Sequence, residues 1–161
     1  MSALVPIIMG SKSDLAHGQA IASALSALGI DSAIRTASAH KVPRYLFDLL
    51  TVYSDDPRVK AYITVAGRSN ALSGVVDGFV TVPVIACPPP SDSFGGADIY
   101  SSLRMPSGIT PAVILDPGNA ALFAAKIVGL TDPEVLARVR ALQMANAKRV
   151  IDDDKELNES K

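Results

Sequence analysis

The chain has 161 residues, a length typical of one domain with one hydrophobic core. Hydrophobic residues make up 48% of the sequence and charged residues 19%, which excludes intrinsic disorder over most of its length. The formal net charge of -1 provides no global basic field that would attract nucleic acid or anionic lipid. The low share of charged residues also predicts that some apolar surface is buried between subunits.

The cysteine count and the apolar runs bear on the cellular compartment. Cys87 is the only cysteine, so no intramolecular disulfide can form, which fits a reducing compartment. The first basic residue is Lys12, and we expect no signal peptide because a charged n-region is lacking. No apolar run reaches the length of a membrane span without a charge or several Gly and Pro. We therefore expect a cytoplasmic enzyme or binding domain without a membrane or nucleic-acid partner.

Five short apolar runs predict strands, at residues 5–9, 32–36, 61–65, 82–86 and 112–115. Helical patterns separate them; the first ends at Gly29 and the second has Pro43 in its first turn. Continuously apolar strands that alternate with helices predict a parallel sheet covered on both faces. The expected fold is α/β: a flavodoxin-like three-layer α/β/α sandwich with a five-stranded parallel sheet plus a C-terminal helix. Ligands of such sheets bind beyond the carboxyl ends of the strands.

The C-terminal region follows the last predicted strand. Its apolar spacing predicts a helix over about 133–151, which packs on its own domain or reaches a neighbouring subunit. Residues 152–161 are polar and are expected to form a frayed tail. We find no internal repeat and no linker, and we expect residues 1–161 to form a single catalytic domain.

The first polar loop, at residues 10–14, lies between a predicted strand and a helix, where free N–H groups and the positive helix end favour an anion. Gly10 allows close approach to a ligand, and Ser11 and Ser13 supply hydroxyl donors for phosphate. Asp14 suits ribose hydroxyls, which donate hydrogen bonds to a carboxylate. An ordinary helix cap remains the alternative. The loop matches neither the P-loop nor the Gly-rich dinucleotide pattern, which argues against ATP and NAD.

The second polar loop contains Ser38, His40 and Lys41. Histidine suits proton transfer near neutral pH, lysine can bind phosphate or carboxylate, and the serine can donate a hydrogen bond. An exposed histidine beside a solvated lysine is an equally good interpretation of this loop alone. The other histidine, His17, lies within the first predicted helix and is interpreted as a surface or packing residue.

The third polar loop contains Gly67, Arg68 and Ser69, with Gly74 and Gly78 soon after. Small residues allow a flat ring to lie against the main chain, and Arg68 can pair with a carboxylate. The alternative is a glycine-rich turn with a surface arginine.

Two later segments, residues 87–90 and 101–108, are candidates to complete the site. Cys87 is interpreted as a packed thiol rather than a nucleophile. Neither the aspartates nor the two histidines and one cysteine show metal-ligand spacing, so we expect no metal and no cofactor.

Four motifs in order, at residues 10–14, 38–41, 66–70 and 102–108, closely resemble the phosphoribosylaminoimidazole carboxylase family, and the resemblance extends from Val5 to about Leu130. One class of this family is a mutase that moves a carboxylate from nitrogen to carbon of carboxyaminoimidazole ribonucleotide. Class II instead combines free carbon dioxide with aminoimidazole ribonucleotide. Lys41, the sequence at residues 68–71 and the Arg104–Met105–Pro106 sequence resemble class II, although Ala71 replaces a familiar glycine.

The resemblance implies roles for the loop residues. Ser11, Ser38 and Lys41 would hold the phosphate and Asp14 the ribose, while the backbone of 67–69 would hold the ring and position carbon dioxide. His40 would be the acid/base of a reaction that needs neither ATP nor metal. The family also implies a homo-oligomer, a tetramer or an octamer. The alternatives are the mutase reaction and, more remotely, a nucleotide-binding module without catalysis.

Overall fold

The computed structural model describes residues 2–159 and contains a five-stranded parallel sheet in the order β2-β1-β3-β4-β5. The order is that of flavodoxin-like proteins, so the predicted α/β/α sandwich is confirmed. The strands are β1 (Leu4–Met9), β2 (Asp31–Thr36), β3 (Tyr62–Val65), β4 (Val84–Ala86) and β5 (Ala112–Val113). The main helices are α1 (Leu15–Ala27), α2 (Pro43–Ser54), α3 (Ala71–Phe79), α4 (Tyr100–Leu103), α5 (Pro117–Val128) and α6 (Pro133–Glu159).

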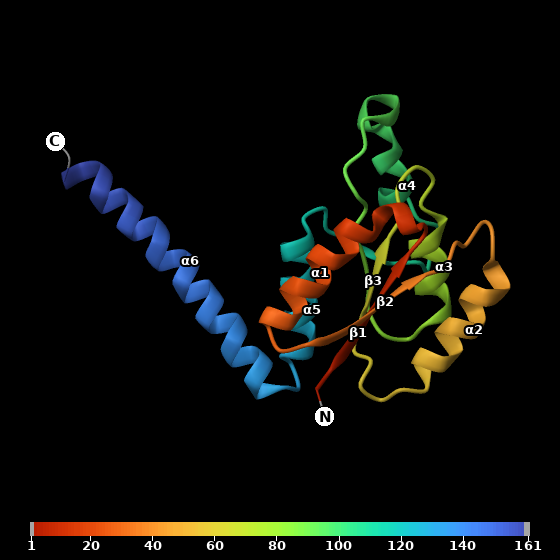
Figure 1. Cartoon of the computed structure of the whole chain (residues 1–161), viewed down its shortest axis with the longest axis horizontal. Helices are drawn as coiled ribbons and strands as arrows, with labels where there is room; N and C mark the ends of the chain where they lie inside the picture. Colours follow the sequence, from red (N-terminus) through yellow and green to blue (C-terminus); the bar gives the residue numbers. More distant parts are fainter. Residues whose placement is uncertain (1, 160–161) are drawn as a thin grey trace.

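The central strand β1 explains the three layers, because its successive side chains enter two different cores. Val5, Ile7 and Met9 pack with residues of α1 and α5, whereas Leu4 and Ile8 pack with residues of α2 and α3. Figure 1 shows α1 and α5 on one side of the sheet and α2 and α3 on the other. Every residue of β1 is buried, as expected for a strand covered on both faces.

The ends of the strands and helices follow local chemistry. β4 begins at Val84, two residues later than predicted, because Pro83 has no N–H to donate to the sheet. β5 ends at Val113 rather than at Leu115, although the N–H of Ile114 still donates to the carbonyl of Ala86 at 2.9 Å. α1 ends before Gly29, which has a φ of +76°, and Pro43 begins α2, both as predicted.

The C-terminal helix is longer than predicted. α6 runs to Glu159, so the prediction of a frayed tail from residue 152 is wrong for residues 152–159, and residues 160–161 lie outside the described chain. Charged residues with good helix propensity continue the helix there, and Lys148 forms an i,i+4 ion pair with Asp152. Only Val135 and Val139 of α6 are buried. Figure 1 shows the rest of this helix projecting away from the sheet.

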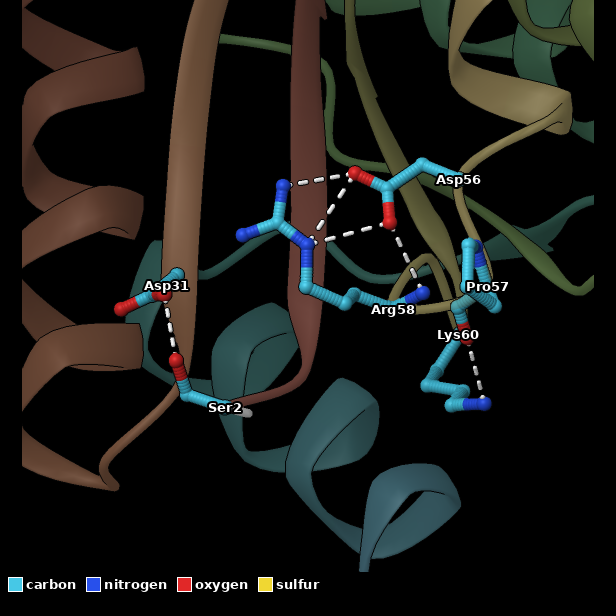
Figure 2. A network of polar contacts seen from close by, with 6 residues as sticks. All are labelled: Ser2, Asp31, Asp56, Pro57, Arg58 and Lys60. Atoms are coloured by element: carbon cyan, nitrogen blue, oxygen red, sulfur yellow. Dashed lines mark hydrogen bonds and ion pairs between the residues drawn. The ribbon is translucent and has the colours of Figure 1, made fainter.

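The two ends of the sheet differ in their polar contacts. At the amino end, Arg58 donates to both carboxylate oxygens of Asp56 at 2.6–3.1 Å, and Ser2 bonds Asp31 (Figure 2). The hydrogen bonds from Arg58 lower the pKa of Asp56. At the carboxyl end, the loops after the strands approach one another, and this end contains the site described below. No helix within residues 2–159 is long and apolar enough to cross a membrane.

Candidate active site

A cleft of about 620 Å³ opens at the carboxyl end of the sheet, between the loops that follow β1, β2, β3 and β4. All ten residues predicted for the site line this one cleft, although they come from three separate loops: Gly10, Ser11, Ser13, Asp14, Ser38, His40, Lys41, Gly67, Arg68 and Ser69. The common direction of the strands brings them together, because parallel strands end at the same edge.

The first loop carries both a helix cap and free polar groups. The hydroxyl of Ser11 accepts a hydrogen bond from the N–H of Ser13 at 3.2 Å, which caps the short 3-10 helix Lys12–Asp14. The cap that the sequence left as an alternative is therefore present. Asp14 is the residue before α1 and makes no side-chain cap bond, and within residues 2–159 its carboxylate accepts only a long bond of 3.3 Å from Ser13. It retains acceptor capacity toward the cleft, while the start of α1 supplies a positive potential.

The second loop is a tight turn that is held together by hydrogen bonds to Ser38. Its hydroxyl accepts from the N–H of Lys41 at 3.3 Å, and its carbonyl accepts from the N–H of Val42 at 3.0 Å. These bonds place His40 and Lys41 at the outside of the turn, where both side chains are exposed. The turn therefore presents one imidazole and one amino group to the cleft.

The third loop bends sharply at Arg68, whose φ of 58° lies in the left-handed region. A residue other than glycine there costs roughly 1 kcal/mol, so neighbouring contacts must compensate. The hydroxyl of Ser101 lies 2.8 Å from the carbonyl of Arg68 and accepts from the N–H of Asn70 at 3.0 Å. Asn70 in turn caps α3 by accepting from the N–H of Ser73 at 3.1 Å.

Gly74 and Gly78 do not serve the purpose that the sequence suggested. A Cβ at Gly74 would lie 3.1 Å from the sulfur of Met105, and one at Gly78 would lie 3.1 Å from Ile109. The missing side chains thus make room for the segment after α4, and neither glycine lines the cleft. Gly67 alone of these three glycines lies beside the ligand space.

The segment after β4 adds residues that the sequence reading missed. Ser91, Asp92 and Ser93 are the additional residues, and they line the cleft together with Pro89 and Pro90, which the sequence already indicates as candidates. Loop serines and aspartates carry no spacing signal, so their contribution required the folded chain. A second cavity of about 350 Å³ adjoins the cleft across Gly67 and Arg68, and Ser102 lines it. Arg104 lines neither space.

His17 and Cys87 form a contact that joins α1 to the end of β4. The Nε2 atom of His17 lies 3.3 Å from the Sγ of Cys87, which is fully buried as expected for a packed thiol. Burial raises the pKa of Cys87 to about 12 and lowers the pKa of His17. Both shifts favour the neutral thiol and imidazole, so the pair is not a thiolate–imidazolium nucleophile.

The cleft contains charges of both signs, from Asp14 and Asp92 and from Lys41 and Arg68. Within residues 2–159, no group of three His, Cys, Asp or Glu side chains is placed to hold a metal ion. What the arrangement offers is a pocket with hydroxyl donors, two cations, a ribose-compatible carboxylate and one histidine. These groups suit a phosphorylated sugar with a small polar ring and a proton transfer.

Comparisons with known proteins agree with this interpretation of the cleft. The sequence model of the family described as AIR carboxylase matches residues 4–149. The phosphoribosylaminoimidazole carboxylase of Treponema denticola is 57% identical over 157 residues, covering 98% of this chain and 99% of that protein. The enzyme of the same name from Archaeoglobus fulgidus is 50% identical, covering 94% of this chain and 83% of that protein.

A solved structure resembles this chain as closely as the relatives found by sequence do. The crystal structure of Treponema denticola PurE superposes with a TM-score of 0.94 at 57% identity, covering 96% of this chain and 98% of that one. A bifunctional rat protein, a phosphoribosylaminoimidazole carboxylase and succinocarboxamide synthetase, is 40% identical over 155 residues. These residues are 96% of this chain and 36% of the rat protein. The chain belongs to the AIR carboxylase family.

Proposed function

We propose that this protein is the class II carboxylase of purine biosynthesis, which converts aminoimidazole ribonucleotide and carbon dioxide reversibly to 4-carboxyaminoimidazole ribonucleotide. The observation that supports it most is the convergence of ten residues from three loops in one cleft, with His40 among them. Family membership supplies the reaction, and the class markers Lys41, Arg68 and Arg104 support carbon dioxide as the donor.

The nucleotide has a place for each of its parts. Ser11, Ser38 and Lys41 bind the phosphate, since hydroxyls and an ammonium are its natural partners. The carboxylate of Asp14 accepts hydrogen bonds from the ribose hydroxyls. Gly10 allows the ligand to approach the main chain closely, and Ser13 supplies a further hydroxyl donor. The main chain of residues 67–69 binds the aminoimidazole and orients carbon dioxide against it.

The reaction needs one base. The electron-rich ring carbon beside the amino-bearing carbon attacks carbon dioxide, a carbon–carbon bond forms, and one electron pair of the carbon dioxide moves onto oxygen. The intermediate carries a proton and a carboxylate on the same carbon and has lost its aromaticity. His40 removes this proton, and the electrons of the C–H bond restore the aromatic ring. In the reverse direction protonated His40 returns the proton and carbon dioxide leaves.

The protein contributes mainly position and electrostatics. Bringing carbon dioxide next to the ring carbon removes much of the entropic cost of a bimolecular step. Donors aimed at the growing carboxylate stabilise the transition state, and losing one such donor typically costs a factor of about 10²–10³ in kcat. The amino group of the substrate supplies the electron density, so the step requires neither ATP nor a metal ion.

The carboxyl donor is tested by a competition. The purified protein is offered aminoimidazole ribonucleotide with dissolved carbon dioxide, and in parallel freshly made N-carboxyaminoimidazole ribonucleotide. Product formation that tracks free carbon dioxide and shows little direct rearrangement is the expected result. Rearrangement that outpaces the supply of free carbon dioxide would assign the mutase reaction. Binding of the nucleotide without turnover of either substrate would instead indicate a nucleotide-binding module.

We further propose that residues 1–161 act as one catalytic domain within a homo-oligomer in the cytoplasm, as a tetramer or an octamer. The length of α6 supports assembly: it exposes Met144, Val150, Ile151 and Leu157 by 55–73% each, beyond its last buried residue. Several exposed apolar side chains on a projecting helix favour burial of that helix against another subunit. The single free cysteine supports a reducing compartment.

A further inference from the structure

The buried polar side chains of the molecule are concentrated behind the third loop. Apart from Tyr62 and Cys87, which are also fully buried, the buried polar side chains within residues 2–159 are those of Thr64, Asn70, Ser73 and Ser102, each at most 3% exposed. Hydrogen bonds connect all four. Burying polar groups is costly unless they are fully paired, so such a cluster indicates a part of the fold that must keep one conformation.

Asn70 is the centre of this cluster. Its Oδ1 accepts from the N–H of Ser73 at 3.1 Å and from the hydroxyl of Ser73 at 2.9 Å, while its Nδ2 donates to Ser102 at 2.9 Å. Because Ser73 gives its proton to Asn70, Thr64 donates to Ser73 across the remaining 2.7 Å contact. The cluster therefore links β3, the start of α3 and α4.

Ser101 connects this cluster to the strained residue of the cleft. Its hydroxyl accepts from the N–H of Asn70 at 3.0 Å and lies within donating distance of two carbonyls, that of Arg68 at 2.8 Å and that of Asp98 at 2.7 Å. A hydroxyl has one proton, so these carbonyls share it. No other hydrogen bond to the carbonyl of Arg68 is found within residues 2–159.

The anchored carbonyl determines the direction of the next amide. The described chain has no cis peptide bond, so the carbonyl of Arg68 and the N–H of Ser69 point in opposite directions. Arg68 and Ser69 both line the cleft, and within residues 2–159 the N–H of Ser69 makes no hydrogen bond. A carbonyl drawn toward α4 therefore leaves a free donor beside the ligand space.

We propose that Ser101, held by Asn70, is a positioning residue that turns the Arg68–Ser69 peptide so that the N–H of Ser69 donates to the carboxylate formed on the substrate. Ser101 does not line the cleft, and it acts only through this peptide. The proposal rests on the carboxylation reaction proposed above. Because the new carboxylate exists only after carbon dioxide has been attacked, the contact lowers the barrier without tightening nucleotide binding.

The test compares steady-state carboxylation by the full-length protein and by Ser101→Ala, Ser101→Thr and Ser23→Ala. Ser23 is exposed on α1 and does not line the cleft, and it serves as the matched serine control. For Ser101→Ala we expect kcat to fall about tenfold, with a KM for aminoimidazole ribonucleotide within about twofold of the unchanged protein. Ser101→Thr, which keeps the hydroxyl, restores most of kcat, and Ser23→Ala matches the unchanged protein.

Each other outcome has a defined meaning. A kcat for Ser101→Ala within about twofold of the control, or a threonine variant no better than alanine, would overturn the positioning role. A lower kcat accompanied by a higher KM and a lower melting temperature would assign Ser101 a purely structural role. This result would also overturn the positioning role. If Ser101→Ala does not fold, Ser102→Ala removes the neighbouring bond to Asn70 and must show the same kcat-selective loss. Absence of carboxylation by the unchanged protein would contradict the proposed function itself.

Discussion

At the residue scale, His40 and His17 differ through their surroundings. His40 is exposed on a turn beside Lys41 and lines the cleft, whereas His17 is half-buried and lies 3.3 Å from the sulfur of Cys87. The sequence distinguished them by position alone, since one followed a predicted strand and the other lay inside a predicted helix. The contact of His17 with Cys87, 70 residues away, had no signal in the sequence.

Replacing His40 tests the assigned base. For His40→Ala we expect kcat/KM for carboxylation to fall by about 10²–10⁴, the usual contribution of a positioned acid or base, with only a modest change in nucleotide affinity. Turnover is followed by loss of aminoimidazole ribonucleotide and affinity by calorimetry. His17→Gln is the control, because it removes the other histidine without touching the cleft. Near-normal turnover by His40→Ala would exclude the role assigned to it.

The reactivity of Cys87 tests the interpretation of the buried pair. Burial raises the pKa of this thiol from 9.0 to about 12, so near pH 8 its thiolate fraction is about a thousandfold lower than that of an unperturbed thiol. We expect almost no labelling by an aromatic disulfide reagent in the native protein and rapid labelling in denaturant. The native rate increases with pH as the thiolate forms. Fast labelling of the native protein near pH 7 that is lost in His17→Gln would indicate a thiolate–imidazolium pair instead.

At the element scale, the sequence predicted the strands and most helices because their apolar periods are long and their caps are explicit. Pro43, Gly29 and the polar loops all lie where the pattern placed them. The length of α6 was underestimated because residues 152–159 have no apolar period, although their helix propensity and ion pairing are sufficient. The left-handed turn at Arg68 could not be predicted either, since it depends on Ser101, 33 residues away.

Gly29 tests how α1 ends and where α6 packs. Its φ of +76° favours glycine, and a Cβ there would lie 1.6 Å from the Nη1 of Arg138 in α6. We expect Gly29→Ala to lower the free energy of unfolding by about 1–2 kcal/mol, from backbone strain plus displacement of the Arg138 guanidinium. Gly108→Ala is the control, because φ there is +84° with nothing within 4 Å of a Cβ.

The comparison by chemical denaturation separates the two causes. Gly108→Ala reports the backbone strain alone, and the excess for Gly29→Ala reports the displaced arginine. Arg138→Ala in the Gly29→Ala background removes that excess. Equal losses for the two glycine variants would show that the guanidinium moves aside without cost.

At the scale of the whole molecule, α6 is the feature that one chain does not explain. After Val139 no residue of this helix is buried. The apolar side chains of Met144 and Ile151 are 73% and 55% exposed. The two lie seven residues apart, so they share one face of the helix. A helix that exposes this apolar face to water gains little stability from packing, and this supports the proposal that the face contacts another subunit.

Lysines on this face test the assembly. The double variant Met144→Lys/Ile151→Lys is expected to reduce the proposed oligomer to smaller species in sedimentation equilibrium, because two charges enter the proposed interface. Gln143→Lys/Asn146→Lys adds the same charge at polar positions of the same helix and serves as control. If the first variant keeps the mass of the unchanged protein, the proposed role of α6 is wrong.

The central claim is that this cleft carboxylates aminoimidazole ribonucleotide with free carbon dioxide and no other reactant. The most direct measurement follows consumption of aminoimidazole ribonucleotide by the purified, chelator-treated protein in bicarbonate buffer without ATP. We predict enzyme-dependent formation of 4-carboxyaminoimidazole ribonucleotide at a rate that increases with free carbon dioxide. No product under these conditions, or product only after addition of ATP or a metal ion, would contradict the account.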